Sequence, residues 1–575
     1  MTEFFQDPPK LGNQYDEDRT LRRYLERRLP ADAFAEVEAD LRRVGGRCVG
    51  DIAELGEDAH AHEPKLRQFD PWGNRIDQIE TSRGWQELDR ISAEEGMVAI
   101  GYERRYGALS RVYQFAKLYL FNPSSAIYTC PLAMTDGAAR LLEVMGDAEL
   151  RAGALERLTS RDPETFWTSG QWMTERTGGS DVGRTETIAR HESGPWYRLH
   201  GTKWFTSATT SQMAMTLARI EDVGGATTPG SRGLSLFYLE TRDADDRLNN
   251  IVIHRLKDKL GTRSLPTAEL GLIGTRAKLV GKPGEGVRNI TTLVNVTRVY
   301  NAICAAATLR RGLALARDYA TRREAFGRRL IDQPLHAATL ADLEVEFQAG
   351  FHLAMRAVEL LGREECGAAT ADESAVLRLL TPLAKLYTAR QAVAGMSEVL
   401  EAFGGAGYVE DTGLPRLLRD AQVLSIWEGT TNVLSLDALR AIDKSDAFGP
   451  FLADIDDLLT GVTLAELSGA VEQAREAATR ARAFLPQAIS EGIDALQAGA
   501  RGFAFSLARL MAAALLLDEA QWNFQTVGDR HGCAVARRWC ATRLTAPAEN
   551  DRDWLAENIA LARDQEIAEA VKSQL

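Results

Sequence analysis

The hydrophobic pattern of the chain changes twice, and these changes constrain the fold most. From residue 18 to about 158, apolar side chains recur at three- and four-residue spacing, the period of amphipathic helices. Between Phe166 and Val280 short β-rich runs replace that period, and from about Gly286 long amphipathic helices return up to about Ile442. We therefore expect a mostly α-helical protein with a central β-barrel or small sheet.

The same pattern predicts individual elements. Strands are expected at residues 196–199, 213–218, 234–239, 250–254 and 268–272, a long helix at 335–361, and a break between helices at 70–73. At 575 residues the chain exceeds one ordinary core. We predict four domains: an N-terminal extension with a helical domain (1–165), a β-barrel (166–282), a helical bundle (283–442) and a C-terminal helical domain (443–575) with breaks near Gly461 and Pro486.

Composition excludes several classes of protein. Hydrophobic residues make up 45% and charged residues 26%, as in a folded soluble protein. The six cysteines are scattered without a Cys-x-x-Cys pair, so we expect no metal site and a reducing cytoplasm. Residues 1–7 do not resemble a secretory signal, and the apolar run at 503–517 is shorter than a membrane span, so we expect a buried helix there.

The charge balance argues against nucleic acid as a partner. The net charge is −13, and residues 441–575 hold 13 Lys and Arg against 20 Asp and Glu, a balance of −7. A domain of that sign should repel phosphate, which disfavours DNA binding.

The heptapeptide 426–432, Ile-Trp-Glu-Gly-Thr-Thr-Asn, places one carboxylate beside large apolar side chains. Ile426 and Trp427 should exclude water from Glu428, which makes a carboxylate a better base, and Gly429 allows a bound molecule to approach the backbone. Taken alone, the same residues also fit a helix end followed by a glycine turn.

Four further stretches have both an ordinary and a ligand-binding interpretation. A Gly-rich turn at 171–182 and an aromatic pair beside a hydroxyl pair at 201–207 are either a loop and a strand or the border of a planar heteroaromatic ligand. Paired arginines at 321–327 and glycines at 401–408 either end helices or bind a pyrophosphate.

Together, six motifs in order resemble the signature series of flavin-dependent acyl-CoA dehydrogenases. They are Met173-Thr174-Glu175 with Gly179-Ser180-Asp181, Trp204-Phe205-Thr206, Lys259-Leu260-Gly261-Thr262-Arg263, Arg323 with Phe326-Gly327, Phe403-Gly404-Gly405-Ala406-Gly407 and Trp427-Glu428-Gly429-Thr430. The residues after 443, the stretch 255–261 and the Trp before Glu428 are most similar to the AidB-like, alkylation-response branch. The resemblance implies an N-terminal helical domain, a β-barrel and a helical bundle around FAD, plus an extra C-terminal domain.

The resemblance also implies roles for matched residues. Those expected to border the flavin and its phosphate arm are Met173, Thr174, Ser180, Trp204, Phe205, Thr206 and Ser207, with Trp427, Gly429, Thr430 and Asn432 near the flavin of their own chain. Those expected to reach the adenosine-pyrophosphate half of FAD in a neighbouring subunit are Arg323, Phe326, Glu401, Gly404 and Gly405. An oligomer, with a tetramer as the family's expectation, follows from this arrangement.

Glu428 matches the family's catalytic base. Some members carry that glutamate on a distant helix before an arginine, and here the corresponding pair is Thr297-Arg298, which leaves Glu428 as the matched base. The implied reaction is α-proton abstraction from an acyl-CoA by Glu428 with β-hydride transfer to flavin N5, and an electron-transfer protein as acceptor. Two alternatives stay open: a flavin-containing, DNA-associated alkylation-response protein with residual dehydrogenase activity, and a flavin oxidase or monooxygenase on the same fold.

Overall fold

The structure is a computed structural model, and it describes residues 6–544, 558 and 561–563. Residues 1–5 of the predicted N-terminal extension, and the remaining residues of the predicted C-terminal domain after 544, lie outside the described residues. The chain divides into two compact units. We call Lys10–Arg311 with Ala406–Val423 the barrel unit, and Met1–Pro9 with Gly312–Gly405 and Leu424–Leu575 the bundle unit.

The barrel unit begins with helices whose first turns are capped by side chains. For example, the Asp18 side chain accepts a hydrogen bond from the Leu21 N–H at the start of α1, and Ser82 caps α4 in the same way. The helices are α1 (Arg19–Arg28), α2 (Ala31–Arg47), α3 (Asp51–Ala61), α4 (Arg83–Glu94), α5 (Ala99–Glu103), α6 (Leu109–Phe121), α7 (Thr129–Met145), α8 (Ala148–Leu150), α9 (Glu156–Leu158) and α13 (Leu414–Leu424), the last of which ends in the bundle unit.

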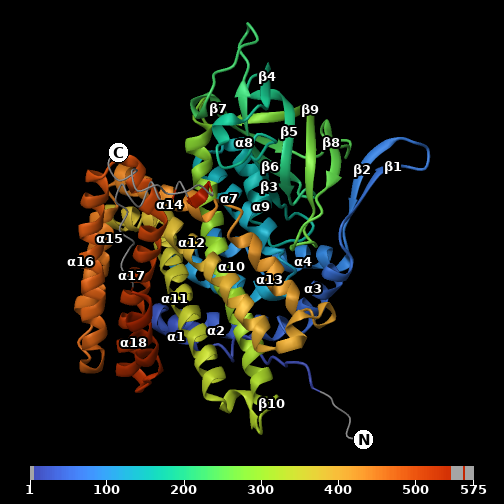
Figure 1. Cartoon of the computed structure of the whole chain (residues 1–575). Coiled ribbons are helices and arrows are strands. Elements are labelled where there is room, and N and C mark those ends of the chain that lie inside the picture. The colour runs from blue at the N-terminus through green and yellow to red at the C-terminus, as the bar shows by residue number, and fades with distance from the viewer. Residues whose placement is uncertain (1–5, 545–557, 559–560, 564–575) are drawn as a thin grey trace, which may run out of the picture. The chain divides into compact units, whose positions relative to one another are not determined.

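The prediction that residues 18–158 are purely helical is wrong at one place. A β-hairpin, β1 (Lys65–Phe69) and β2 (Arg75–Glu80), surrounds the predicted break at 70–73. Asp70 closes its turn, because Oδ1 accepts the N–H groups of Trp72 and Asn74. The hairpin runs beside strand β8 of the barrel (Figure 1).

The predicted barrel is confirmed, and all five predicted strands are present. Its strands are β3 (Ser169–Trp172), β4 (Ile188–Ser193), β5 (Trp196–Ser207), β6 (Met213–Ile220), β7 (Leu234–Glu240), β8 (Ile251–Leu256) and β9 (Thr267–Val280). The order β6-β4-β5-β9-β7 closes on itself because β7 also pairs with β6, while β3 and β8 extend β6 and β9. Closure leaves no free edge in the ring.

Alternating side chains fill the barrel and cover one of its faces. Trp172, Leu199, Phe237 and Leu270 belong to a buried cluster inside it. A second buried cluster joins strands β6 and β7 to helix α7 and to the start of α10 (Gly286–Arg322), which continues into the bundle unit. The barrel is thus held by packing on both surfaces of its strands.

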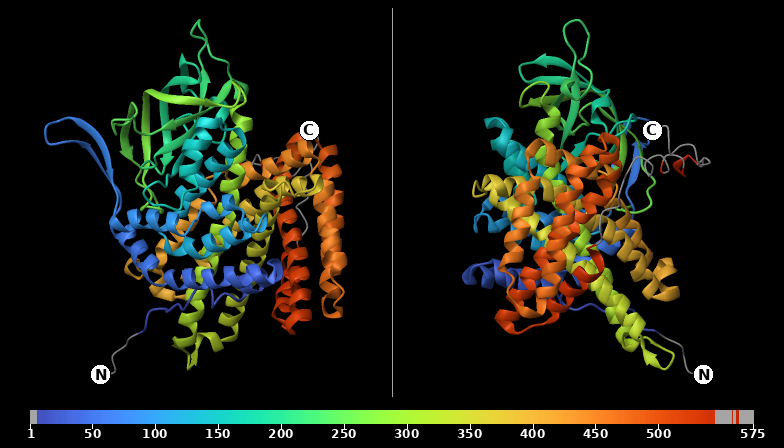
Figure 2. Two further views of the ribbon diagram at one scale, coloured as in Figure 1. Left: turned by 180° about the vertical axis from the view of Figure 1, so that it is seen from behind. Right: turned by 60° about the vertical axis from the view of Figure 1, so that its left-hand side comes forward.

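The helices of the bundle unit include the long helix predicted at 335–361. They are α11 (Pro334–Glu365), α12 (Ala371–Ala402), α14 (Thr431–Ser445), α15 (Phe448–Gly461), α16 (Ser468–Ser490), α17 (Ile493–Val527) and α18 (His531–Arg543), with a short hairpin of β10 (Glu324–Ala325) and β11 (Arg328–Arg329). Helices α16, α17 and α18 stand side by side (Figures 1 and 2), and α17 packs against α11, α12 and α14.

Two predictions about the C-terminal helices have different outcomes. The break near Gly461 is confirmed, since α15 ends there, but the second break lies a few residues after Pro486, because α16 continues through the proline to Ser490 and α17 begins at Ile493. Ala481 and Ala488 are buried on either side of the proline, so packing outweighs the loss of one backbone donor. Among the described residues, only α17 is long and apolar enough to cross a membrane, and 72% of its apolar window is buried inside the protein. That burial agrees with the core helix that we predicted.

Candidate functional site

The barrel unit brings two of the predicted flavin-contacting stretches together. The residues after β3 lie beside the end of β5, because the Trp204 N–H donates to the Thr174 carbonyl at 2.9 Å. Gly179 lies close to Thr174, and a Cβ at that glycine would be 2.5 Å from the threonine hydroxyl. The turn therefore requires glycine for its close approach.

A buried ion pair supports this junction. Lys203 Nζ lies 2.7 Å from Glu175 Oε1, and the two side chains are 0% and 3% exposed. Burial favours the neutral acid, but Lys203 and the donors on Glu186 and Thr187 lower the pKa of Glu175. Because Glu175 follows Thr174 and Lys203 precedes Trp204, the pair fixes both predicted flavin-contacting residues. Sequence reasoning missed it.

The aromatic pair on β5 is partly accessible. Phe205 is 54% exposed and Trp204 is half-buried. The Lys257 ammonium lies 3.7 Å from the centre of the Trp204 ring and 4.6 Å from that of Phe205, and it pairs with Glu269 at 2.6 Å. The result is a cation beside an aromatic surface.

The remaining predicted residues of this unit differ in what their side chains reach. Ser180 is exposed and Met173 is half-buried. The Thr206 hydroxyl is buried and donates to the Ala268 carbonyl, while Ser207 Oγ lies 3.1 Å from Thr267 Oγ1. Thr206 therefore uses its hydroxyl within the barrel, and its carbonyl accepts from the Thr209 hydroxyl at 2.7 Å.

The bundle unit holds the predicted base in a turn between helices. Residues 425–428 form a turn after α13, and α14 begins at Thr431. Glu428 has φ +55° and Gly429 has φ +101°. The left-handed conformation costs a residue with a Cβ about 1–2 kcal/mol, and such strain is concentrated at functional sites.

The expected apolar shielding of Glu428 is weaker than predicted. Ile426 is 56% exposed and Glu428 is half-buried. The physical reason is the turn itself, since consecutive residues in a turn point in different directions. Within the bundle unit, Ile426 therefore does not cover the carboxylate.

Buried Lys385 of α12 contacts the turn on both sides of Glu428. Its Nζ lies 2.7 Å from the Trp427 carbonyl and 2.7 Å from the Gly429 carbonyl, and the residue is 0% exposed. Sequence reasoning missed Lys385, although one signal was available: it is the single charged residue in the apolar stretch 379–387.

Other predicted residues of the bundle unit lie at helix ends. The Thr430 side chain makes no capping hydrogen bond, and Asn432 Oδ1 accepts from Arg501 of α17 at 3.1 Å. Glu401 is exposed near the end of α12, where Gly404 has φ +60° and Gly405 follows. The glycines thus form a helix terminus, as their ordinary interpretation requires, and they remain accessible to a ligand.

Arg323 and Phe326 share the hairpin between α10 and α11. Phe326 has φ +51° and is 99% exposed, and Gly327 has φ +75°. The Phe326 ring is therefore free to meet another molecule at this turn.

Each unit, taken by itself, carries residues that fit the FAD that the resemblance implies. In the barrel unit the buried Gln171 Oε1 lacks a hydrogen-bond partner among the described residues, and the glycine turn and the aromatic pair of that unit suit a flavin with its phosphates. In the bundle unit the buried Trp427 Nε1 is a donor without a partner among the described residues. The second helix position at which some members of the family carry the catalytic glutamate is occupied here by Thr297. This residue is buried on α10, and its hydroxyl donates to the Val294 carbonyl.

Comparison with known families covers nearly the whole chain. The N-terminal domain of the adaptive response protein AidB matches residues 6–164, the middle domain of acyl-CoA dehydrogenases matches 170–273, their C-terminal domain matches 284–442, and an acyl-CoA dehydrogenase 11 C-terminal domain-like family matches 446–568.

Individual relatives belong to the same family as these domain matches. The chain is 44% identical to acyl-CoA dehydrogenase family member 11 of Caenorhabditis elegans, over 93% of this chain and 88% of that protein. It is 33% identical to the putative acyl-CoA dehydrogenase AidB of Escherichia coli, over 68% and 71% of the two chains. The crystal structure of Caenorhabditis elegans ACDH-11 in complex with C11-CoA superimposes with a TM-score of 0.95 at 41% identity, covering 99% of this chain and 98% of that one. The chain therefore belongs to the acyl-CoA dehydrogenase family and carries the N-terminal domain of its AidB-like branch.

Proposed function

We propose that this protein is an FAD-dependent acyl-CoA dehydrogenase whose catalytic base is Glu428. The observation that carries the proposal is the strained turn that presents this glutamate, with φ +55° at Glu428 and +101° at Gly429. The acyl-CoA complex of the C. elegans relative supports an acyl-CoA substrate, because that relative matches this chain over almost its full length.

The proposed reaction gives each group in the chain a task. The Glu428 carboxylate accepts the proton from the carbon α to the thioester carbonyl. When bound, FAD supplies the acceptor for the hydride that leaves the β-carbon. Trp204 and Phe205 would pack on the flavin and Trp427 would donate its unpaired N–H to a bound acceptor. Fixed placement of the base, not its acidity alone, accounts for much of such an acceleration.

Replacing Glu428 with glutamine tests this role. The amide keeps the shape of the side chain but cannot accept the α-proton, so we expect FAD to be retained and flavin reduction to slow by about 10²–10⁴-fold. The measurement is anaerobic bleaching of the flavin by acyl-CoAs of graded length and branching, including an 11-carbon chain. Glu398→Gln, on the exposed face of α12, is the control. Bleaching of the Glu428→Gln protein at the parental rate would refute the mechanism.

The same titration addresses the alternative activities. Rapid reoxidation of the reduced flavin by air, compared with an electron-transfer protein as acceptor, would favour the oxidase or monooxygenase alternative. Salt-dependent retention on duplex DNA would favour the alkylation-response alternative, which the balance of −7 over residues 441–575 opposes.

We also propose a homo-oligomer, with a tetramer as the family expectation, working in the cytoplasm. The exposed Phe326 supports it, because a neighbouring subunit that receives this ring would remove it from water. In that arrangement Arg323, Phe326, Glu401, Gly404 and Gly405 would contact the partner's FAD. Light scattering of the purified holoprotein gives the subunit number.

A further inference from the structure

We infer that Lys385 is a positioning residue for Glu428: its buried ammonium holds the backbone on both sides of the base in the conformation that proton abstraction requires. We call the two contacts of Lys385 Nζ with the Trp427 and Gly429 carbonyls the clamp. The role of Glu428 rests on the proposed function, but the clamp is a property of the turn and is measurable without a substrate.

The turn needs an external constraint. Glu428 and Gly429 occupy successive positive-φ conformations, and only the glycine adopts one without strain. Left to itself, a glutamate would return to a right-handed or extended backbone, and its carboxylate would swing away. The first-turn hydrogen bond of α14, from the Leu434 N–H to the Thr430 carbonyl, fixes the chain only after the turn.

Lys385 supplies that constraint from the other side. The two carbonyls that it contacts belong to Trp427 and Gly429, so the two residues that flank Glu428 both turn their oxygens toward one nitrogen. Two acceptors that converge on one tetrahedral ammonium fix the backbone path through Glu428, the residue between them. Because the ammonium is out of water, releasing either carbonyl would cost it a hydrogen bond that solvent cannot replace.

The helix that carries Lys385 is itself firmly held. Tyr387, two residues further along α12, is buried, donates to Glu346 of α11 and lies edge-on to Phe505 of α17, with ring centres 5.7 Å apart. The C-terminal domain therefore stiffens the segment of α12 that holds the turn. A rigid support is what a positioning residue needs, since a base displaced by about 1 Å loses about 10²-fold in rate.

An ion pair between α12 and α14, the helix that follows the turn, provides a matched control. Arg378 of α12 pairs with Asp437 of α14 at 2.7 Å, so it joins the two helices without contacting the turn. A general loosening of α12 against α14 would follow from either Arg378→Met or Lys385→Met. Loss of the clamp would follow only from Lys385→Met, because methionine fills similar space and has no donor.

The experiment compares the parent, Lys385→Met, Arg378→Met, Glu428→Gln and the double variant Lys385→Met with Glu428→Gln, all as full-length holoproteins. Amide hydrogen exchange over residues 425–432 reports the turn directly. We expect faster exchange there in Lys385→Met, while Arg378→Met matches the parent in this segment.

Kinetics separate positioning from folding. In Lys385→Met we expect the rate of flavin reduction to fall by about 10²-fold while acyl-CoA affinity and FAD content stay within about twofold of the parent. The double variant should be no slower than Glu428→Gln alone, because both changes act through the same carboxylate. An equal fall in substrate affinity, or a double variant slower by the product of the single effects, would overturn the inference.

The two hypotheses fail in different ways. If no acyl-CoA bleaches the parent but exchange at 425–432 rises only in Lys385→Met, the dehydrogenase proposal fails and the clamp stands. If the parent is active and Lys385→Met shows parental exchange and parental reduction, the clamp is refuted and the dehydrogenase proposal stands.

Discussion

Replacing Lys203 with methionine should destabilise the barrel and release FAD. In the native protein the ammonium pairs with Glu175 at 2.7 Å and also donates to the Leu217 carbonyl at 3.0 Å. Both charged side chains are almost completely buried, so the substitution leaves a carboxylate in the interior without its counterion. The backbone hydrogen bond from the Trp204 N–H to the Thr174 carbonyl depends on the positions of the adjacent residues Lys203 and Glu175.

The magnitude follows from those contacts. Removing one partner of a buried ion pair costs about 3–5 kcal/mol, and an unpaired buried carbonyl adds about 1 kcal/mol. Three donors stay on the carboxylate, from the Glu186 N–H and from the N–H and hydroxyl of Thr187, and they offset part of that cost. We expect a net loss of about 4 kcal/mol in the free energy of unfolding of the barrel.

The assay is urea unfolding of the holoprotein followed by flavin fluorescence, which rises when the barrel releases FAD. The double variant Lys203→Met with Glu175→Gln should recover about 2 kcal/mol, because glutamine still accepts from the backbone and carries no charge. The deficit of the single variant should also shrink as the pH falls, since protonation neutralises the abandoned carboxylate. A single variant that loses less than about 1 kcal/mol, or a double variant that recovers nothing, would refute the reasoning.

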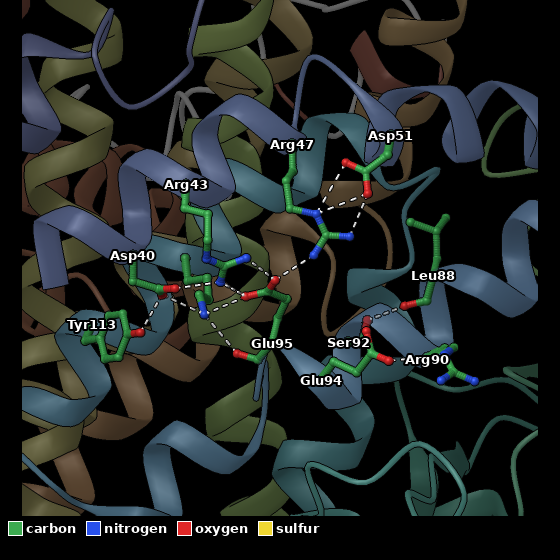
Figure 3. A network of polar contacts seen from close by, with 11 residues as sticks. Asp40, Arg43, Arg47, Asp51, Leu88, Arg90, Ser92, Glu94, Glu95 and Tyr113 are labelled. Atoms are coloured by element: carbon green, nitrogen blue, oxygen red, sulfur yellow. Dashed lines mark hydrogen bonds and ion pairs between the residues drawn. The ribbon is translucent and has the colours of Figure 1, made fainter. Parts of the chain in front are cut away.

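Three further predictions concern other parts of the structure. Gly429→Ala should slow flavin reduction by at least about 10-fold without changing FAD content, because φ is +101° and the new Cβ would lie 2.9 Å from Leu434 Cδ2. Stopped-flow spectroscopy measures the rate of flavin reduction, and a rate equal to that of the parent would contradict the prediction. In the polar network of Figure 3, burial raises the pKa of Glu95, but hydrogen bonds from Arg43 and Lys117 lower it to about 2 from 4.5. The stability that this carboxylate contributes is therefore complete above pH 4.5 and is lost as the pH falls toward 2. The Glu95→Gln variant should be about 3 kcal/mol less stable than the parent at pH 7 and should lack that acid dependence. Urea unfolding at several pH values measures both effects. Phe326→Ser should weaken subunit association and lower FAD retention together, as light scattering and flavin content would show. If both stay at the parental level, the Phe326 ring is not part of a subunit interface.

The sequence predicted the parts of this protein that follow from local periodicity. The strands at 213–218 and 234–239 appeared as β6 and β7 because short apolar runs between turn residues have few other solutions. The hairpin at 65–80 was missed because its tip, Asp70 to Gly73, also looks like a break between helices.

The supports of the candidate site could not be predicted in the same way. Lysine is rarely buried, so Lys385 and Lys203 would be assigned to the surface from their type alone. The partners of Lys385 lie 42 and 44 residues away in the sequence, and only the folded chain brings them to the ammonium. Glu428 was recognised from its motif, but the strain at its backbone is a property of the turn that no motif states.

The packing of α17 also bears on how far the chain can be shortened. A protein truncated after Ser445 would keep every motif of the family, yet it would lose Phe505, Trp539 and Arg543, which contact Tyr387 and Glu346. The faces of α11 and α12 that α17 now covers would then meet water. Removing the last domain would thus give an aggregation-prone, poorly folding fragment and not a minimal enzyme. The C-terminal domain is therefore part of the structure that supports the turn carrying Glu428.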